Sequence, residues 1–143
     1  MNSIKNEGKE SVNPKTVVKE FWASYNRGNL DETWTTYVAE DIIIHPPAGV
    51  ELDRESWLAM EKALFAAFED VDVKVLDQVA EDDMVASRWS LTARQTTEFM
   101  GVPSRGRTAT VTGILFDRVR DDKIAEHWAE LSLSHFLQVL SAE

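Results

Sequence analysis

The first half of the chain carries hydrophobic residues at the spacing of amphipathic helices. Asn13 followed by Pro14 is typical of a helix N-terminus, with Asn as the cap and Pro at the first helical position. The next apolar residues recur at helical intervals, and Gly28 follows the last of them, as expected just beyond a helix end. This first predicted helix buries one face, formed by Val17, Val18, Phe21, Trp22 and Tyr25.

Two more helices and a short strand follow before the chain changes character. We predict a helix from about residue 30 to 38, with Trp34, Tyr37 and Val38 on one side. The β-branched run of residues 42–44 predicts a strand that His45-Pro46-Pro47 ends. A third helix begins after the cap residue Asp53. Its apolar stripe consists of Trp57, Met60, Leu64 and Phe68.

The second half alternates apolar and polar residues, as strands do. Val71, Val73 and Val75 are separated by Asp72 and Lys74, and acidic turn residues follow at 81–83. Asp121-Asp122 indicates a tight hairpin turn. We expect residues 136–140 to form a turn of helix. Further strands are predicted over residues 84–95, 108–119 and 123–133.

Helices first and an antiparallel meander second predict an α+β fold. Three N-terminal helices can cover one face of a curved antiparallel sheet and leave a central pocket between the layers. Residues 1–12 are polar and aperiodic, and we expect a disordered tail there. Residues 13–143 are predicted to form a single domain.

The composition and net charge of the chain argue against several classes of function. The chain has 143 residues, a net charge of -10 and no Cys. This acidity argues against nucleic acid as a partner and against a polybasic membrane anchor. No apolar run is long enough for a membrane span, and the N-terminus lacks the apolar core of a signal peptide. We therefore expect a cytoplasmic protein.

Metal and cofactor chemistry find no support in the sequence. The three His residues show no metal-ligand spacing, and Cys ligands are excluded. The chain also lacks a phosphate-binding loop, a dinucleotide fingerprint and a nucleophile elbow. We expect neither metal nor cofactor.

Aromatic residues are the first candidates for ligand contact. The chain has five Trp, which is many for its length. Pockets for flat apolar ligands are mostly lined by aromatic side chains, although packing in the core is an equal alternative for each residue. The candidate pocket residues on segments that face the helix–sheet interface are Trp34, Tyr37, Trp57, Trp89 and Trp128.

The last predicted strand carries a candidate acid–base group. Strand alternation places Trp128, Glu130 and Ser132 on one face, which we assign to the concave side, and His127 on the outer face. A Glu held there would be partly desolvated, which raises the pKa of a carboxyl group toward neutrality. Solvation, or pairing with an Arg on a neighbouring strand, is the alternative. The opposite face, which we expect to pack on another subunit, carries Ala129, Leu131 and Leu133.

His45 is the second acid–base candidate. It ends a strand just before a Pro-Pro turn, where side chains often reach the rim of a pocket. An imidazole titrates near neutrality and can carry protons. A purely structural His is the alternative.

Three segments resemble the SnoaL-like polyketide cyclase family, which has the nuclear-transport-factor-2-like fold. They are ALFAAFEDVDVKV, DMVASRWSLTARQTTEFMGVPSRGR and VTGILFDRVRDDKIAEHW, and the resemblance extends over about residues 17–140. It implies a cone-like fold around an apolar pocket, a hydrophobic small-molecule ligand and a homodimer formed through the sheet. It also implies acid–base chemistry without metal or cofactor, which in the family's cyclases is aldol closure of a polyketide ester.

Two positions depart from the family pattern. Ser132 stands where the cyclases carry an acid–base Asp, and Gln95 stands where a His is common. Neither side chain can exchange protons at neutral pH. Glu130 or His45 would then be the catalytic group, the placement of His45 being similar to that of the base in ketosteroid isomerases. Gln95 or Ser132 would donate a hydrogen bond to the developing oxyanion.

The sequence thus leaves several functions open. The first is a cofactor-free cyclase or isomerase acting on a hydrophobic carbonyl compound. The second is a non-catalytic small-molecule binding protein, favoured by the loss of the family Asp. The third is epoxide hydrolysis, for which Arg88 and Glu130 supply two of the three groups needed. A role in subunit interaction is the last.

Overall fold

The computed structural model describes residues 12–143. The disordered tail expected over residues 1–12 therefore lies almost wholly outside the described residues. The described helices are α1 (Pro14–Asn26), α2 (Leu30–Tyr37), α3 (Arg54–Ala67) and α4 (Leu133–Ser141). The described strands are β1 (Val38–His45), β2 (Phe68–Glu81), β3 (Met84–Gln95), β4 (Thr108–Arg120) and β5 (Lys123–Leu131).

The helix ends follow the capping residues that the sequence indicates. The Asn13 side chain accepts a hydrogen bond from the Lys15 backbone nitrogen at 2.8 Å, and Pro14 starts α1. Gly28 has a φ of 89° just beyond the end of α1, a conformation that glycine adopts without steric cost. At the start of α3 the Asp53 side chain accepts from the Ser56 backbone nitrogen at 2.9 Å.

The five strands form one sheet in the order β1-β5-β4-β3-β2. Strands β2 to β5 make an antiparallel meander, whereas β1 joins the free edge of β5 in parallel. The sheet is therefore mixed. Strand β1 precedes α3 in the chain, is not part of the meander, and pairs with β5 in parallel. The β4–β5 turn uses Asp121 and Asp122, with φ of 55° and 62°, as a tight hairpin requires.

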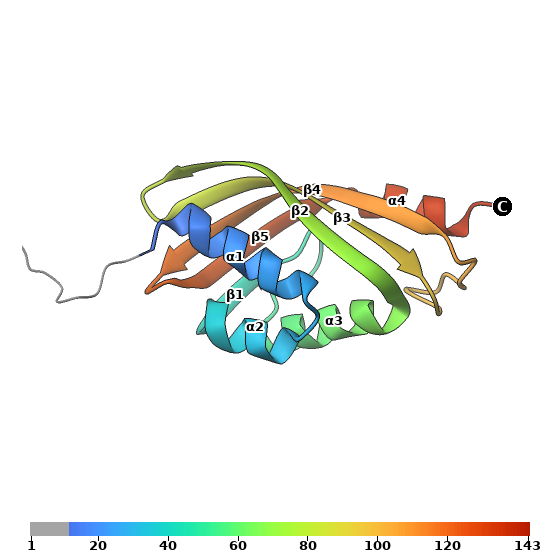
Figure 1. Ribbon diagram of the computed structural model, residues 1–143, viewed down its shortest axis with the longest axis horizontal. Helices are drawn as coiled ribbons and strands as arrows, with labels where there is room; N and C mark the ends of the chain where they lie inside the picture. Colours follow the sequence, from blue (N-terminus) through green and yellow to red (C-terminus); the bar gives the residue numbers. More distant parts are fainter. Residues whose placement is uncertain (1–11) are drawn as a thin grey trace, which may run out of the picture.

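The sheet curves over α1, α2 and α3 (Figure 1). Helix α1 packs along β2, where the Asn26 side chain donates to the Val73 carbonyl at 2.9 Å and accepts from the Val73 nitrogen at 2.8 Å. The C-terminal segment forms a helix of 9 residues, α4, which anchors Phe136 and Leu140 in the core. The predicted α+β fold with helices on a curved sheet is confirmed, with the parallel β1 and the longer α4 as additions. None of the described helices is long and apolar enough to cross a membrane.

Candidate functional site

Two adjoining cavities lie between α3 and the inner face of the sheet, the face that the helices cover. The larger has a volume of about 600 Å³, and the smaller has about 60 Å³. No Lys or Arg of residues 12–143 lines either cavity. The walls of the larger cavity are mainly apolar, and include Met60, Leu64, Leu91, Phe99, Val111 and Phe136. The two cavities share Pro46, Pro47, Met60, Glu61, Trp89 and Leu131.

Glu61 of α3 brings a carboxylate to the junction of the two cavities. The Tyr25 hydroxyl of α1 donates to its Oε1 at 2.5 Å, and the Trp57 indole nitrogen donates to its Oε2 at 3.1 Å. Trp57 and Glu61 stand four residues apart, so they share one face of α3. Each carboxylate oxygen is therefore held by one donor, and the group is fixed in orientation.

Burial sets the proton affinity of this network. Burial raises the pKa of Glu61, and this outweighs the opposing effect of the donors Tyr25 and Trp57 and of the His127 charge. The pKa of Tyr25 is raised well above its usual value, first by burial and then by the charge of Glu61. Glu61 is thus a carboxyl group that holds its proton to higher pH than an exposed Glu does.

His127 and Asp117 form a buried pair beside the smaller cavity. They are register partners on β5 and β4, and His127 Nδ1 lies 2.6 Å from Asp117 Oδ1. A carboxylate only accepts, so Nδ1 of the imidazole carries the proton of this hydrogen bond, and Nε2 is the nitrogen left for a ligand. The ring stacks on Trp57, with centroids 4.7 Å apart and planes at 21°. The hydrogen bond and the stacking therefore hold the imidazole in a fixed orientation.

The predicted face of β5 is wrong. His127 is 4% exposed and lines the smaller cavity, whereas Glu130 is exposed on the outer face of the sheet. Trp128 lies on that outer face as well, opposite Phe116 of β4. His127, Ala129 and Leu131 point inward, and all three line the smaller cavity beneath the helices. Trp128 and Glu130 do share a face as predicted, but it is the outer face, and Ser132 lies beyond the end of β5 at the start of α4.

His45 also lies outside the cavities. Its Nε2 is 2.8 Å from Glu126 Oε2 and its Nδ1 is 3.4 Å from Glu51 Oε2. Its ring stacks on Trp128 with centroids 4.9 Å apart. The structure therefore joins His45 and Trp128 in one cluster on the outer face, apart from the cavity walls. Pro46, the next residue, does line both cavities.

The predicted oxyanion donors are engaged elsewhere. Gln95 is fully buried, and its side-chain nitrogen donates to the carbonyls of Thr97 at 3.0 Å and Val102 at 2.8 Å. Ser132 precedes the first residue of α4 without a side-chain capping bond, and its hydroxyl oxygen accepts from the Thr112 nitrogen at 3.0 Å. Neither side chain lines a described cavity.

Among the predicted aromatic residues, Trp57 and Trp89 line the cavities. Trp34 is packed in the core against Phe21 and Trp57, and Tyr37 is partly buried against the same core. Neither reaches a described cavity. The structure does not support epoxide hydrolysis, the third predicted function. Arg88 lies on the outer face of the sheet in a bidentate pair with Asp77.

Sequence reasoning missed Tyr25, Glu61 and Asp117, and it placed His127 on the wrong face. Two of these residues do leave a signal in the sequence. Asp117 occupies the same strand parity as Leu115 and Val119, which are buried, and an acidic residue at such a position is rarely left without a partner. Glu61 likewise falls within the apolar stripe of its helix, four residues after Trp57.

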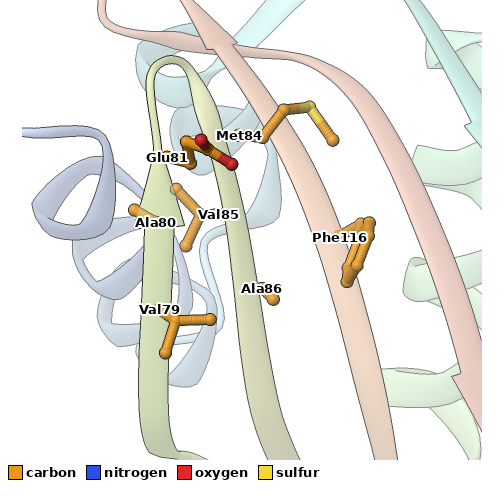
Figure 2. A pocket seen from close by; sticks show the side chains of 7 residues that line it. All are labelled: Val79, Ala80, Glu81, Met84, Val85, Ala86 and Phe116. Atoms are coloured by element: carbon orange, nitrogen blue, oxygen red, sulfur yellow. The ribbon is translucent and has the colours of Figure 1, made fainter.

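The outer face of the sheet holds an open apolar groove. Figure 2 shows Val79, Ala86 and Phe116 across β2, β3 and β4, with Glu81 and Met84 near the β2–β3 turn. Phe116 is 47% exposed and Val79 is 71% exposed. This groove has no titratable residue except Glu81 in its walls, so it offers contact area and not acid–base chemistry. Within residues 12–143 no group of three or more His, Asp or Glu could hold a metal ion.

Sequence comparison defines the class of this protein. The family model of the SnoaL-like polyketide cyclases matches residues 15–138. The chain belongs to this family. No curated protein matches it significantly.

Solved structures give the same class. The chain is similar to IdmH of Streptomyces antibioticus, a candidate polyketide cyclase, with 33% identity, a TM-score of 0.81 and coverage of 90% of this chain and 99% of that one. It is also similar to AclR of Streptomyces galilaeus, a candidate hydroxylase, with 28% identity, a TM-score of 0.80 and coverage of 89% and 80%. A candidate SnoaL-like polyketide cyclase from Jannaschia sp. CCS1 shares the fold, at 20% identity, a TM-score of 0.82 and coverage of 91% and 92%.

Proposed function

We propose that the protein is a cofactor-free cyclase or isomerase that performs acid–base chemistry on a hydrophobic, polyketide-like carbonyl compound. The observation that carries this proposal is the meeting of Glu61 and the Asp117–His127 pair at a mainly apolar cavity. Pairs of titratable groups whose surroundings separate their proton affinities are typical of acid–base sites. His45 and Glu130 are replaced in the proposal because they lie on the other face of the sheet.

His127 is the base in this mechanism. Its Nε2 takes a proton from the carbon next to the carbonyl, and the electron pair of the broken C–H bond forms the enolate double bond. The negative charge moves to the carbonyl oxygen. Asp117 stabilises the imidazolium that results, because their hydrogen bond becomes an ion pair.

Glu61 is the acid. In aldol closure the enolate carbon bonds to a second carbonyl carbon, and Glu61 donates its proton to the new alkoxide. The imidazolium of His127 then returns its proton to the Glu61 carboxylate, and both groups regain their starting state. In an isomerisation the imidazolium instead returns the proton to another carbon of the ligand.

Exchange of the acidic C–H proton tests this function without knowledge of the natural substrate. Polycyclic aromatic ketones, polyketide methyl esters and steroid ketones are incubated with the protein in deuterium oxide, and deuterium uptake is followed by mass spectrometry. We expect uptake for one of these classes, and a loss of about 100-fold or more in His127→Gln. Glu130→Gln and His45→Gln are the matched controls, and both should keep full exchange.

The alternative is a non-catalytic small-molecule binding protein of the same family. It predicts that ligands quench the fluorescence of Trp57 or Trp89 while no compound exchanges deuterium. Exchange that survives in His127→Gln but is lost in Glu130→Gln would overturn our assignment of the residues. It would instead place the reaction on the outer face of the sheet.

We also propose that a second copy of the chain covers the outer face of the sheet. Ile114 and Phe116 are each nearly half exposed there, on the central strand β4, and Val79 extends the apolar area across β3 to β2. Such a patch is self-complementary when related by a two-fold axis. Phe116→Glu should convert a dimer into a monomer in analytical ultracentrifugation, and a wild-type protein that is monomeric would refute the proposal.

A further inference from the structure

Two Trp residues that line the smaller cavity carry a buried indole N–H without a hydrogen-bond partner. Trp22 of α1 and Trp89 of β3 are 4% and 5% exposed, and their ring centroids lie 5.4 Å apart. Within residues 12–143 neither Nε1 atom finds an acceptor. A buried donor left unpaired costs about 1–3 kcal/mol, so two of them on neighbouring residues beside one cavity require an explanation.

The position of these donors suggests what they bind. Both indoles line the smaller cavity, which also contains Glu61 and His127 in its walls. Trp89 in addition lines the larger cavity. A space of about 60 Å³ accommodates a small polar group and no ring system, so a ligand would place its skeleton in the larger cavity and one oxygen in the smaller.

The other indoles do not share this situation. The Trp57 N–H is used by Glu61, and Trp128 lies on the outer face. The Trp34 N–H is also without a partner among the described residues, but Trp34 is enclosed by core side chains and lines neither cavity. Among the described residues, Trp22 and Trp89 are therefore the indoles that line a cavity and have an N–H without an acceptor.

We propose that Trp22 and Trp89 form a carbonyl-binding subsite, in which their two N–H groups hold the ligand oxygen and stabilise the negative charge that develops on it. This inference rests on the proposed function, since it supplies the electrophilic donors for the enolate that His127 generates. Neutral donors placed where charge develops stabilise a transition state without first attracting an anion.

The subsite also selects a ligand class. The donors are neutral, and an anionic ligand would have to lose its hydration in a mainly apolar cavity, which is costly unless the charge is paired. No Lys or Arg lines the described cavities to pair with such a charge. The ligand is therefore a neutral ketone, ester or phenol at one end of a hydrophobic skeleton, and not a free carboxylic acid.

Nitrogen-15 NMR of the indole groups tests the subsite directly. The five Trp N–H signals are assigned with single Trp→Phe variants, and the wild-type protein is titrated with 2-naphthol and with naphthalene. Naphthalene reports ring-current effects alone. We expect 2-naphthol to move the Trp22 and Trp89 indole protons downfield relative to naphthalene, while the Trp34 signal stays in place.

Affinity provides a second readout. Trp89→Phe should weaken 2-naphthol binding about tenfold and leave naphthalene binding nearly unchanged, because only one hydrogen bond is lost. Trp128→Phe is the matched control on the outer face and should change neither affinity. Equal wild-type affinity for the two compounds, or indole protons that respond to both alike, would overturn the proposal.

The proposed function and the proposed subsite can be refuted independently of each other. If deuterium exchange depends on His127 but the indole protons ignore 2-naphthol, the oxyanion assignment is wrong and the proposed function stands. If the indole protons respond to 2-naphthol but no carbonyl compound exchanges deuterium, the subsite stands as a binding site and the catalytic function is wrong.

Discussion

Asp117 and His127 face each other across β4 and β5, and a hydrogen bond of 2.6 Å joins them beneath α3. Their side chains are 1% and 5% exposed. Trp57 covers the face of the imidazole, while Asp117 holds its edge. The base that we propose is thus oriented by two contacts on regular elements, which fixes its direction more rigidly than a loop would.

Removal of Asp117 should destabilise the fold strongly. Asp117→Ala leaves His127 Nδ1 buried with no acceptor, and breaking a buried pair in this way typically costs about 3–5 kcal/mol. Asp117→Asn should cost less, because the amide oxygen still accepts a hydrogen bond. The free energy of unfolding in urea measures both effects.

An exposed pair supplies the control for this measurement. Asp77 binds Arg88 through two carboxylate oxygens on the outer face, where solvent screens the interaction. Asp77→Ala should therefore change the free energy of unfolding far less than Asp117→Ala does. Equal effects would show that burial of the Asp117–His127 pair contributes nothing to its importance.

Glu61 should make the protein less stable as pH rises from acid toward neutral. Burial raises the pKa of Glu61 above its usual value of 4.5, so the folded state binds this proton more tightly than the unfolded state. The free energy of unfolding then falls as pH increases from the unfolded pKa through the folded one. Glu61→Gln removes this contribution, so the variant should gain stability relative to wild type over that interval. Urea titrations at several pH values measure the difference, and parallel curves would contradict it.

Asp53 should make the free energy of unfolding depend on pH in the opposite direction to Glu61. Its hydrogen bonds with Ser56 at the start of α3 hold the pKa of Asp53 below its usual value of 3.8. Its stabilising effect is therefore present above the unfolded pKa and is lost as pH falls through the folded one. Asp53→Asn, which keeps a capping oxygen, should lose stability relative to wild type on the neutral side and approach it in acid. A constant difference between the two proteins would contradict the assignment.

Most of the fold could be predicted because local signals agree with the final structure. Pro14, Gly28 and Asp53 mark helix ends through backbone chemistry that acts within a few residues. The alternation over residues 84–95 predicts β3 with the bounds that the structure shows. The parallel pairing of β1 could not be predicted in this way, since it depends on the tertiary packing that brings β1 beside β5, a strand far along the chain.

The candidate site could be predicted less well, and β5 shows why. Alternation groups Trp128 with Glu130 and His127 with Ala129, but it does not say which group faces the helices. The decision is difficult here because both faces of the sheet carry large apolar residues: Phe116 lies on the outer face and Leu115 on the inner. Composition alone favours the face with Trp128 as the pocket, whereas in the structure the cavity is lined by the other face, with His127, Ala129 and Leu131.

Gly113 lets the β5 strand approach β4 closely beside the cavities. It is the register partner of Leu131, and a Cβ at this position would lie 2.5 Å from the Leu131 Cδ2 atom and 2.6 Å from the Glu130 carbonyl oxygen. The leucine could rotate, but the carbonyl belongs to the strand pairing and cannot move without breaking it. Gly113→Ala should therefore destabilise the fold by roughly 1–3 kcal/mol, measured by urea unfolding.

The same substitution should weaken ligand binding as well as lower the stability of the fold. Leu131 lines both cavities, so its displacement by a methyl group at position 113 changes the walls where we place the ligand skeleton. We expect Gly113→Ala to weaken naphthalene and 2-naphthol binding alike, because it alters shape and removes no donor. Thr108→Ala, at the exposed start of the same strand, should change neither stability nor binding. A Gly113→Ala protein as stable as wild type would show that β4 and β5 are less tightly packed at this point, and that Leu131 is free to leave the cavity wall.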